Sequence, residues 1–400
     1  MKLSFGAEVG GLPYDGNVGV RIVRTLDTAG GFTTMTPFTL PQNLPPGHSV
    51  GEYVSFPGFS TPLAAKNDYT DVLPSLNLRL HWSEHLQSRL AVSEGMARPD
   101  FSQLQAFTTL GSTITQSTGI QTFTGTANGN PQLKPTKAFQ LDGTLEWYFA
   151  PSGSLTWDVF YKHLTDIVLN RVFNTAATDS AGGTHEFTTT GPINAARGDL
   201  KGFEVAYQQY YDFLPRLLRG IGTQLNFTYI DGHQSVDHAN TGTYCEGFDA
   251  FSVNLNGCDT DGRAFGNLPL QNISKYAYNA ALLYDRGPVS ARLAYSWRSK
   301  YLLGTNVYPL QGTNGTNTDP SSPTYGQQNV TWGLPIYGAS YGELDASVFY
   351  NITSHLTLGV QALNLTDALY RTLEQQHVGT TAFEWYGSGR TYSVQLRATF

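Results

Sequence analysis

Two cysteines have the simplest chemistry to state in this chain. Cys245 and Cys258 are its only cysteines, and the polar stretch around them is rich in Gly, Asp and Asn. Disulfides persist in an oxidising compartment such as the cell exterior, and closing a loop of this length stabilises a fold by about 3 kcal/mol. The alternative is two unpaired thiols. We expect a disulfide in a long exposed loop.

Histidines and aspartates in the same stretch offer donor atoms for a metal ion. They are His233, His238, Asp231, Asp237, Asp249, Asp259 and Asp261. The histidine spacing matches no standard ligand pattern, and the aspartates lack the periodic oxygen-ligand spacing of a calcium loop. We therefore expect solvated loop residues here, with no metal site and no cofactor.

No catalytic constellation emerges along the chain. The segment Gly387-Ser388-Gly389 lacks the strand-elbow-helix context of a hydrolase nucleophile. Acidic residues are plentiful, but nothing in the sequence singles out a glycosidase pair. We expect that the protein is not an enzyme and has no catalytic residue.

Aromatic residues in polar stretches are the best candidates for ligand contact. An aromatic face can stack on a sugar ring or on an aromatic group, and nearby amides supply orientation. The candidates are Phe123, Tyr325, Trp332, Tyr337, Trp385 and Tyr386, accompanied by Tyr341 and Phe383. The alternative is that these rings pack loops together or form the aromatic belt of a membrane protein.

The segments that must position these side chains alternate apolar and polar residues. They include 3–9, 76–82, 139–149, 155–162, 221–229, 289–298, 356–362 and 391–400. Successive side chains of a strand point to opposite faces, so each segment has one apolar and one polar face. A tilted strand of about 9–11 residues crosses a bilayer. We expect a membrane β-barrel whose closing strand carries Tyr392 and ends on Phe400.

Composition is compatible with this interpretation. The 400 residues include 42 Gly, 23 Tyr and 22 Phe, with 14% charged residues, and the mean hydropathy is -0.25. No run of about 18 apolar residues exists, which excludes a helical membrane protein. The net charge of -7 disfavours nucleic acid as a partner. No signal peptide is recognisable at Met1, so the options are a cytosolic protein or, as we prefer, a fragment that begins inside a strand.

Short and long connections alternate between the strands. Tight turns are expected at 83–87, 150–152, 215–220, 286–287 and 353–354, and long polar connections near 27–72, 95–137, 231–273, 299–341 and 365–390. Long loops on every second connection are typical of an up-and-down barrel with short periplasmic turns and are uncommon in compact soluble domains. The count is about 13 strands, and because bacterial barrels use an even number, we expect further strands upstream.

Several segments resemble TonB-dependent outer-membrane receptors, the plugged barrels of roughly 22 strands. The segments are 16–25, 69–78, 98–101, 130–135, 202–204, 364–370 and 389–392, and they occur in the family's order up to Phe400. The most distinctive are the "NPxLKP" pattern at 130–135 and the "NLxDxxY" pattern at 364–370. The chain looks closest to the large subgroup of carbohydrate-scavenging proteobacteria.

The resemblance implies an all-β, antiparallel up-and-down transmembrane β-barrel, with residues 1–400 forming its C-terminal part, about 13 of roughly 22 strands. The N-terminal plug, the TonB box and the early strands are expected to be absent. It further implies the outer membrane of a Gram-negative bacterium and active uptake of a scarce nutrient, an oligosaccharide or a siderophore, energised through TonB in the full-length protein.

The implied partners are outer-membrane lipid, the TonB complex and plug domain of the full-length protein, the barrel-assembly machinery, and a carbohydrate or siderophore ligand. Two alternatives remain open: a passive porin-like channel, and a secreted all-β binding protein or adhesin.

Overall fold

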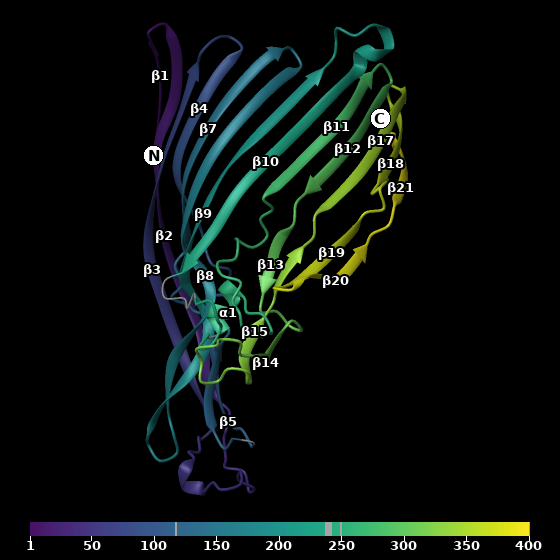
Figure 1. Cartoon of the computed structure of the whole chain (residues 1–400). Coiled ribbons are helices and arrows are strands. Elements are labelled where there is room, and N and C mark those ends of the chain that lie inside the picture. Colours follow the sequence, from purple (N-terminus) through teal and green to yellow (C-terminus); the bar gives the residue numbers. More distant parts are fainter. Residues whose placement is uncertain (117, 237–241, 249, 400) are drawn as a thin grey trace.

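The structure is a computed structural model that describes residues 1–116, 118–236, 242–248 and 250–399. A large antiparallel sheet forms the body of the molecule (Figure 1). Its successive strands among the described residues are β1 (Lys2–Val9), β2 (Leu12–Met35), β3 (Phe59–His81), β4 (Leu86–Ala97), β7 (Thr136–Ala150), β8 (Gly153–Thr178), β9 (Thr184–Tyr210), β10 (Ile221–Val236), β11 (Tyr276–Arg286), β12 (Val289–Arg298), β17 (Tyr341–Thr353), β18 (Leu356–Leu363) and β21 (Thr391–Ala398). Each pairs antiparallel with the next. The predicted antiparallel up-and-down fold is confirmed.

One face of this sheet is apolar and exposed. On the last two strands Val360 lies opposite Val394, and the two side chains are 47% and 74% exposed. The other face is polar: Arg79 Nε donates to Asp15 Oδ2 at 2.9 Å, and Arg89 Nε to Glu146 Oε1 at 2.6 Å. Apolar and polar side chains therefore alternate every second residue along each strand, as expected when the two faces of a sheet have different surroundings.

The short turns all lie at one end of the sheet. The turns expected between β3 and β4, β7 and β8, β9 and β10, β11 and β12, and β17 and β18 are confirmed, the third with a short 3-10 helix, η2 (Arg216–Gly220). A sixth turn, Gly10-Gly11, was missed. Both of its residues have positive φ, 60° and 81°, which two glycines adopt without strain.

Most of the predicted long connections were wrong in extent, because much of 27–72, 95–137, 299–341 and 365–390 is strand, whereas in 231–273 β10 continues only to Val236. The hairpin β2–β3 continues well past residue 27, and β8–β9 forms a long hairpin where we had predicted no long connection. Two strands, β5 (Phe107–Ile114) and β6 (Gln121–Ala127), lie inside the predicted loop 95–137. Backbone pairing, rather than a sustained alternation of apolar and polar residues, marks β5 and β6 as strands.

The end of the molecule opposite the short turns carries smaller sheets (Figure 1). β13 (Tyr301–Thr305), β16 (Pro335–Gly338), β19 (Leu369–Gln376) and β20 (Gly379–Gly387) form a four-stranded sheet in that neighbour order, antiparallel throughout. They extend β12, β17, β18 and β21 past short irregular stretches. Nearby are the hairpin of β14 (Gln311–Thr316) and β15 (Gln328–Gly333) and the helix α1 (Ala250–Asn256).

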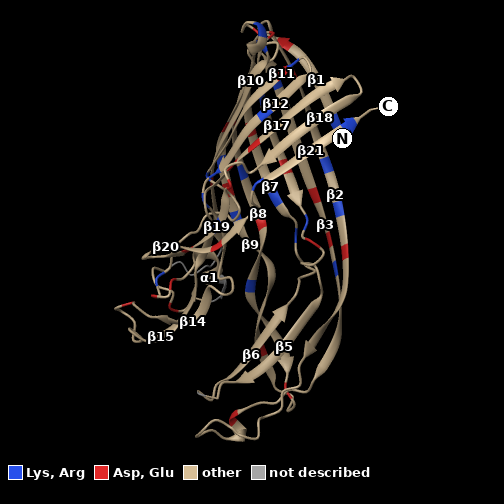
Figure 2. Ribbon diagram, turned by 90° about the vertical axis from the view of Figure 1, so that its right-hand side faces the viewer, with Lys and Arg blue, Asp and Glu red and all other residues tan. Residues whose placement is uncertain are grey.

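The main sheet is an open trough with two free edges (Figure 1). Within the described part of the chain, β1 pairs only with β2, and β21 only with β18. Tyr392 lies on β21, 66% exposed, whereas Phe400 lies outside the described residues. Figure 2 shows acidic and basic residues interspersed along the strands, with long uncharged stretches between them. Among the described helices, none is long and apolar enough to span a membrane.

Candidate ligand-binding site in the tip lobe

Three units stand at the long-loop end of the sheet. The tip lobe consists of the far ends of β2, β3, β8 and β9, the hairpin β5–β6 and the 3-10 helix η1 (Val50–Glu52). The disulfide lobe consists of residues 242–248 and 250–271 with the β14–β15 hairpin. The third unit is the four-stranded sheet. Figure 1 shows the tip lobe as the most distant part from the short turns.

The tip lobe is built by bridging strands that are not neighbours in the main sheet. β5 pairs parallel with the end of β2, and β6 pairs parallel with β9. This brings Phe56, Phe123 and Phe187 together, with ring centroids 5.2–5.4 Å apart. Phe187 and Phe56 are 0% and 2% exposed. The lobe therefore has its own aromatic core.

A hollow of about 360 Å³ opens beside this core. Its lining comprises His48, Glu52, Tyr53, Val54, Gly119, Gln121, Phe123 and His185. Gln121 holds the wall together, because its amide donates to the carbonyl of Val54 at 2.7 Å and accepts the N–H of Val54 at 2.9 Å. Tyr53 donates its hydroxyl to the carbonyl of Gly119 at 3.0 Å. The hollow thus has an aromatic floor and a fixed polar wall.

One side of the hollow carries an imidazole and a carboxylate. His48 Nδ1 lies 2.7 Å from Glu52 Oε2. Glu52 Oε1 accepts the backbone N–H and the hydroxyl of Ser49, both at 2.9 Å. The Ser49 N–H, then the His48 ring and the Ser49 hydroxyl, lower the pKa of Glu52. Glu52 is therefore an anion at neutral pH, oriented by the start of η1.

The lining also includes the imidazole of a second pair, formed by His185 of β9 and Asp179 of the β8–β9 turn. His185 Nε2 lies 2.6 Å from Asp179 Oδ2, and Asp179 Oδ1 accepts the N–H groups of Ala181 and Gly183, each at 2.8 Å. The His185 ring lies 5.3 Å from the ring of Phe123. Its hydrogen bond, with those of Gly183 and Ala181, lowers the pKa of Asp179. The carboxylate holds the imidazole beside the aromatic floor.

This arrangement suits binding. An aromatic floor with two imidazoles and an amide at its rim can stack on a planar or sugar ring and hydrogen-bond its substituents. In the part of the chain that the structure describes, no serine or cysteine side chain is hydrogen-bonded to either imidazole, so the pairs form no nucleophile–base arrangement.

The six predicted aromatic contacts do not form one site. Only Phe123 lines the tip-lobe hollow. Trp332 packs on the disulfide-lobe core, with Nε1 donating to Asn314 Oδ1 at 3.0 Å, and Tyr325 is 62% exposed in a turn of that lobe. Tyr337, Trp385 and Tyr386 lie on the four-stranded sheet. The long connections fold as separate units, which keeps these rings apart.

The aromatics of the four-stranded sheet differ in environment. Tyr337 is partly buried with the ammonium group of Lys300 4.5 Å from its ring, and burial raises its pKa. Trp385 and Tyr386 are 60% and 55% exposed, and Tyr386 donates its hydroxyl to Glu384. These two rings remain accessible to a ligand, but no described hollow gathers them.

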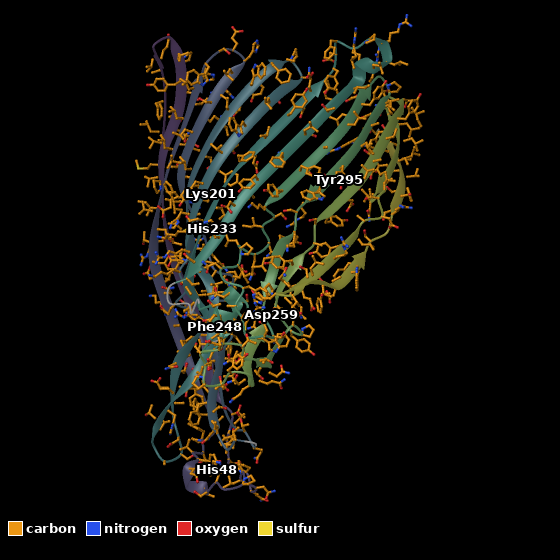
Figure 3. The ribbon with its side chains drawn as sticks, in the orientation of Figure 1. His48, Lys201, His233, Phe248, Asp259 and Tyr295 are labelled. Atoms are coloured by element: carbon orange, nitrogen blue, oxygen red, sulfur yellow. A yellow bond between two sulfur atoms is a disulfide. The ribbon has the colours of Figure 1, made fainter. Side chains whose placement is uncertain are left out.

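The two cysteines are joined in the structure. Cys245 and Cys258 form a disulfide with a Cα–Cα distance of 6.1 Å. They pack with Phe248, Val253 and Val330 into the buried core of the disulfide lobe. Figure 3 shows Phe248 and Asp259 in this lobe, with His48 at the far end of the tip lobe.

The predicted loop donors do not form one cluster, although Asp259 and Asp261 lie close together in the disulfide lobe. His233 and Asp231 lie on β10, so their assignment to a loop was wrong. His238, Asp237 and Asp249 lie outside the described residues. Asp259 is buried in the disulfide lobe. Backbone pairing with β9 extends β10 to Val236 and carries its polar end into the sheet.

Most of the tip-lobe hollow was missed from the sequence. His48, Glu52, Tyr53 and His185 were not among the predicted residues. One local signal was available, because Ser49 and Glu52 have the spacing of a capping box. The positions of both imidazoles, however, depend on pairing between distant strands.

Comparison with protein families gives the class of this fold. Residues 11–365 match the family described as TonB dependent receptor-like, beta-barrel. The chain belongs to this family, and the resemblance found in the sequence is confirmed. No curated protein matches the chain in sequence.

Solved structures share the fold at low sequence identity. The siderophore receptor PirA from Acinetobacter baumannii is similar over 100% of this chain and 54% of its own, with a TM-score of 0.55 at 13% identity. The ferric enterobactin receptor PfeA from Pseudomonas aeruginosa (mutant Q482A, with enterobactin) has a TM-score of 0.52 at 14% identity, and the similarity covers 100% of this chain and 53% of that receptor. The FrpB iron transporter from Neisseria meningitidis has a TM-score of 0.51 at 10% identity, and the similarity covers 100% of this chain and 44% of that transporter. The chain therefore spans about half the length of these proteins.

Proposed function

We propose that this chain forms the C-terminal part of the barrel of an outer-membrane receptor that takes up a scarce nutrient, energised through TonB in the full-length protein. The supporting observation is the up-and-down sheet with an exposed apolar face and a polar inner face, in a chain of the TonB-dependent receptor family. A receptor of this kind works with outer-membrane lipid, a plug domain, the TonB complex and the barrel-assembly machinery.

The polar inner face supports a lumen occupied by protein or solute. A hollow of about 340 Å³ on this face is lined by residues that include Gln208, Asn226, Asn279 and Arg292. These side chains offer donors and acceptors to a plug domain, which would not be expected of a lipid-facing surface. A plug filling this space would distinguish the receptor from the passive porin-like channel.

The tip-lobe hollow is the candidate for first contact with the nutrient. Its aromatic floor at Phe123 and its imidazoles at His48 and His185 fit either an oligosaccharide or a siderophore. Aromatic and hydrogen-bonding groups can bind both ligand classes, so the oligosaccharide and the siderophore are tested separately. Membership of the carbohydrate-scavenging subgroup remains a prediction from the sequence. We also propose that binding here involves no enzymatic step.

Uptake in the host organism tests the function. The coding sequence is deleted, and uptake of labelled oligosaccharides and of ferric siderophores is measured with and without an active TonB complex. We expect one ligand class to lose uptake in the deletion strain and, equally, in the strain without TonB. Unchanged uptake of both classes refutes the receptor, and uptake that needs this gene but not TonB favours a passive channel.

A point variant tests the site. Phe123→Ala, with its product checked for normal abundance in the outer membrane, should weaken binding of the transported ligand at least about tenfold by loss of ring stacking. Tyr325→Ala is the matched control, because Tyr325 is an exposed aromatic residue of another lobe. Equal affinities for the two variants would count against the tip-lobe hollow.

A further inference from the structure

We propose that Asp259, Asp261 and His377 form a binding site for a divalent transition-metal ion of the zinc class. Asp259 and Asp261 belong to the disulfide lobe, and His377 lies in the turn between β19 and β20. One donor atom from each residue lies within 4.8 Å of the other two. A metal here would tie the disulfide lobe to the four-stranded sheet.

The distances between donor atoms suit a single ion. His377 Nδ1 lies 2.9 Å from Asp259 Oδ2 and 3.8 Å from Asp261 Oδ1. Zinc binds imidazole nitrogen and carboxylate oxygen at about 2.0–2.2 Å, so two ligands of a tetrahedral ion lie about 3.4 Å apart. The observed values bracket this separation, and shifts of a few tenths of an ångström would complete the geometry.

The imidazole is fixed in the orientation that a ligand needs. The Phe265 ring stacks on the His377 ring at 4.4 Å between centroids and 1° between planes. The backbone N–H of His377 donates to Asp259 Oδ2 at 2.6 Å, which anchors the turn. Asp259 is in turn oriented by the N–H of Thr260, 2.7 Å from its Oδ1. Little conformational freedom would be lost when a metal binds.

The charge balance of the cluster favours a cation. Asp259 is 3% exposed. Among the described residues, its only ion-pair partner is His377. Arg263 is held by Asp261, with its Nη2 2.6 Å from Asp261 Oδ2. Of the described ion-pair partners of the two carboxylates, only Arg263 carries a permanent charge, and a buried carboxylate is costly without compensation.

The donor set selects the class of metal. An imidazole nitrogen with two carboxylate oxygens suits zinc and similar first-row ions, whereas calcium and magnesium prefer oxygen ligands alone. Asp261 is half-buried and His377 is exposed, which leaves room for water in the remaining coordination position. His377 lies 118 residues from Asp259, so no local ligand spacing in the sequence reveals this cluster.

Cobalt binding to the purified chain in detergent tests the site. The protein is first stripped of metal with a chelator and then titrated with Co²⁺, whose visible absorption reports nitrogen and oxygen coordination. We expect one saturable ion per chain, displaced by Zn²⁺ but not by Ca²⁺. His377→Gln and Asp261→Asn should each weaken cobalt affinity at least about 100-fold, since even outer-shell partners contribute about 10–100-fold.

His185→Gln is the matched control. His185 forms an equivalent pair with Asp179 but belongs to none of the described three-donor clusters, so cobalt binding should be unchanged. A second measurement, protease cleavage beside the 90% exposed Val378, should slow with zinc in the wild type and not in His377→Gln. Wild-type protein without saturable binding, equal affinity in wild type and His377→Gln, or protection that depends on pH but not on zinc would overturn the proposal.

Discussion

The main sheet and the tip lobe use the same apolar residue types in opposite ways. On the sheet, Val394 and Leu396 are 74% and 66% exposed, whereas in the tip lobe Phe187 and Leu110 are 0% and 1% exposed. Both regions are built from β-strands, although the tip lobe adds two parallel pairings to the antiparallel ones. The difference is the surrounding medium, because lipid covers the apolar face of a membrane barrel, whereas the lobe must cover its own.

The contrast also explains the different local sequence patterns. A strand between lipid and a polar lumen must alternate along its length, and β21 does so from Tyr392 to Ala398. A lobe strand meets a small core at only a few positions, so the buried Phe187 lies between the polar residues Glu186 and Thr188, and the next buried side chain is the polar Thr189. Four predictions test this comparison.

The largest effect is expected from Phe187→Ala. Removing a fully buried ring from the tip-lobe core should lower the unfolding free energy of the lobe by about 3–5 kcal/mol, measured by hydrogen exchange of β5, β6 and the end of β9. The control is Val394→Ala on the lipid-facing side, where lipid fills the vacated space and the loss should be much smaller. Equal losses at the two positions would break the comparison.

Removal of the disulfide should come next. The double variant Cys245→Ser, Cys258→Ser releases a loop with a sequence separation of 13, and the lobe should lose about 3 kcal/mol. Hydrogen exchange in residues 242–248 and 250–271 of the disulfide lobe should accelerate, while exchange in β10 and β11 stays the same. Faster exchange throughout the main sheet would mean that the lobes and the sheet are one cooperative unit.

A lysine on the lipid-facing side should cost less. Val360→Lys should destabilise the chain, folded in bilayers, by about 2 kcal/mol, the lower end of the range for lysine near the midplane. Val50→Lys replaces a valine that is 63% exposed in the tip lobe and should change stability by no more than about 0.5 kcal/mol. Denaturant titration in lipid measures both, and a neutral Val360→Lys would argue that this face meets water.

The smallest effect is a pH dependence confined to the tip lobe. Hydrogen bonds from His185, Gly183 and Ala181 hold the pKa of Asp179 below its ordinary 3.8. A carboxyl group with a lower pKa in the folded state stabilises above its unfolded pKa, and this contribution is lost as pH falls through the folded pKa. Hydrogen exchange near residues 179–185 should therefore accelerate below about pH 4. Asp179→Asn should remove this pH dependence. An unaltered pH profile in that variant would mean that another group causes the pH dependence.

Much of the fold could be predicted from the sequence because one physical rule governs every strand of the main sheet. Alternation over 139–149 and 391–398 identified strands, and turns such as Arg286-Gly287 placed their ends. The candidate site was far less predictable. Phe123 was selected as an aromatic residue in a polar stretch, but its neighbours Phe56 and Phe187 lie more than sixty positions away, and no local pattern connects them.

By itself, the sequence determined the strand order, the lipid-facing side and the end of the sheet that carries the short turns. The reason is that these features follow from a two-residue period and from neighbours along the chain. Only the tertiary structure decided which outer strands pair, and hence where His48 and His185 meet and where Asp259 reaches His377. These contacts join distant segments, whose meeting depends on the packing of whole lobes.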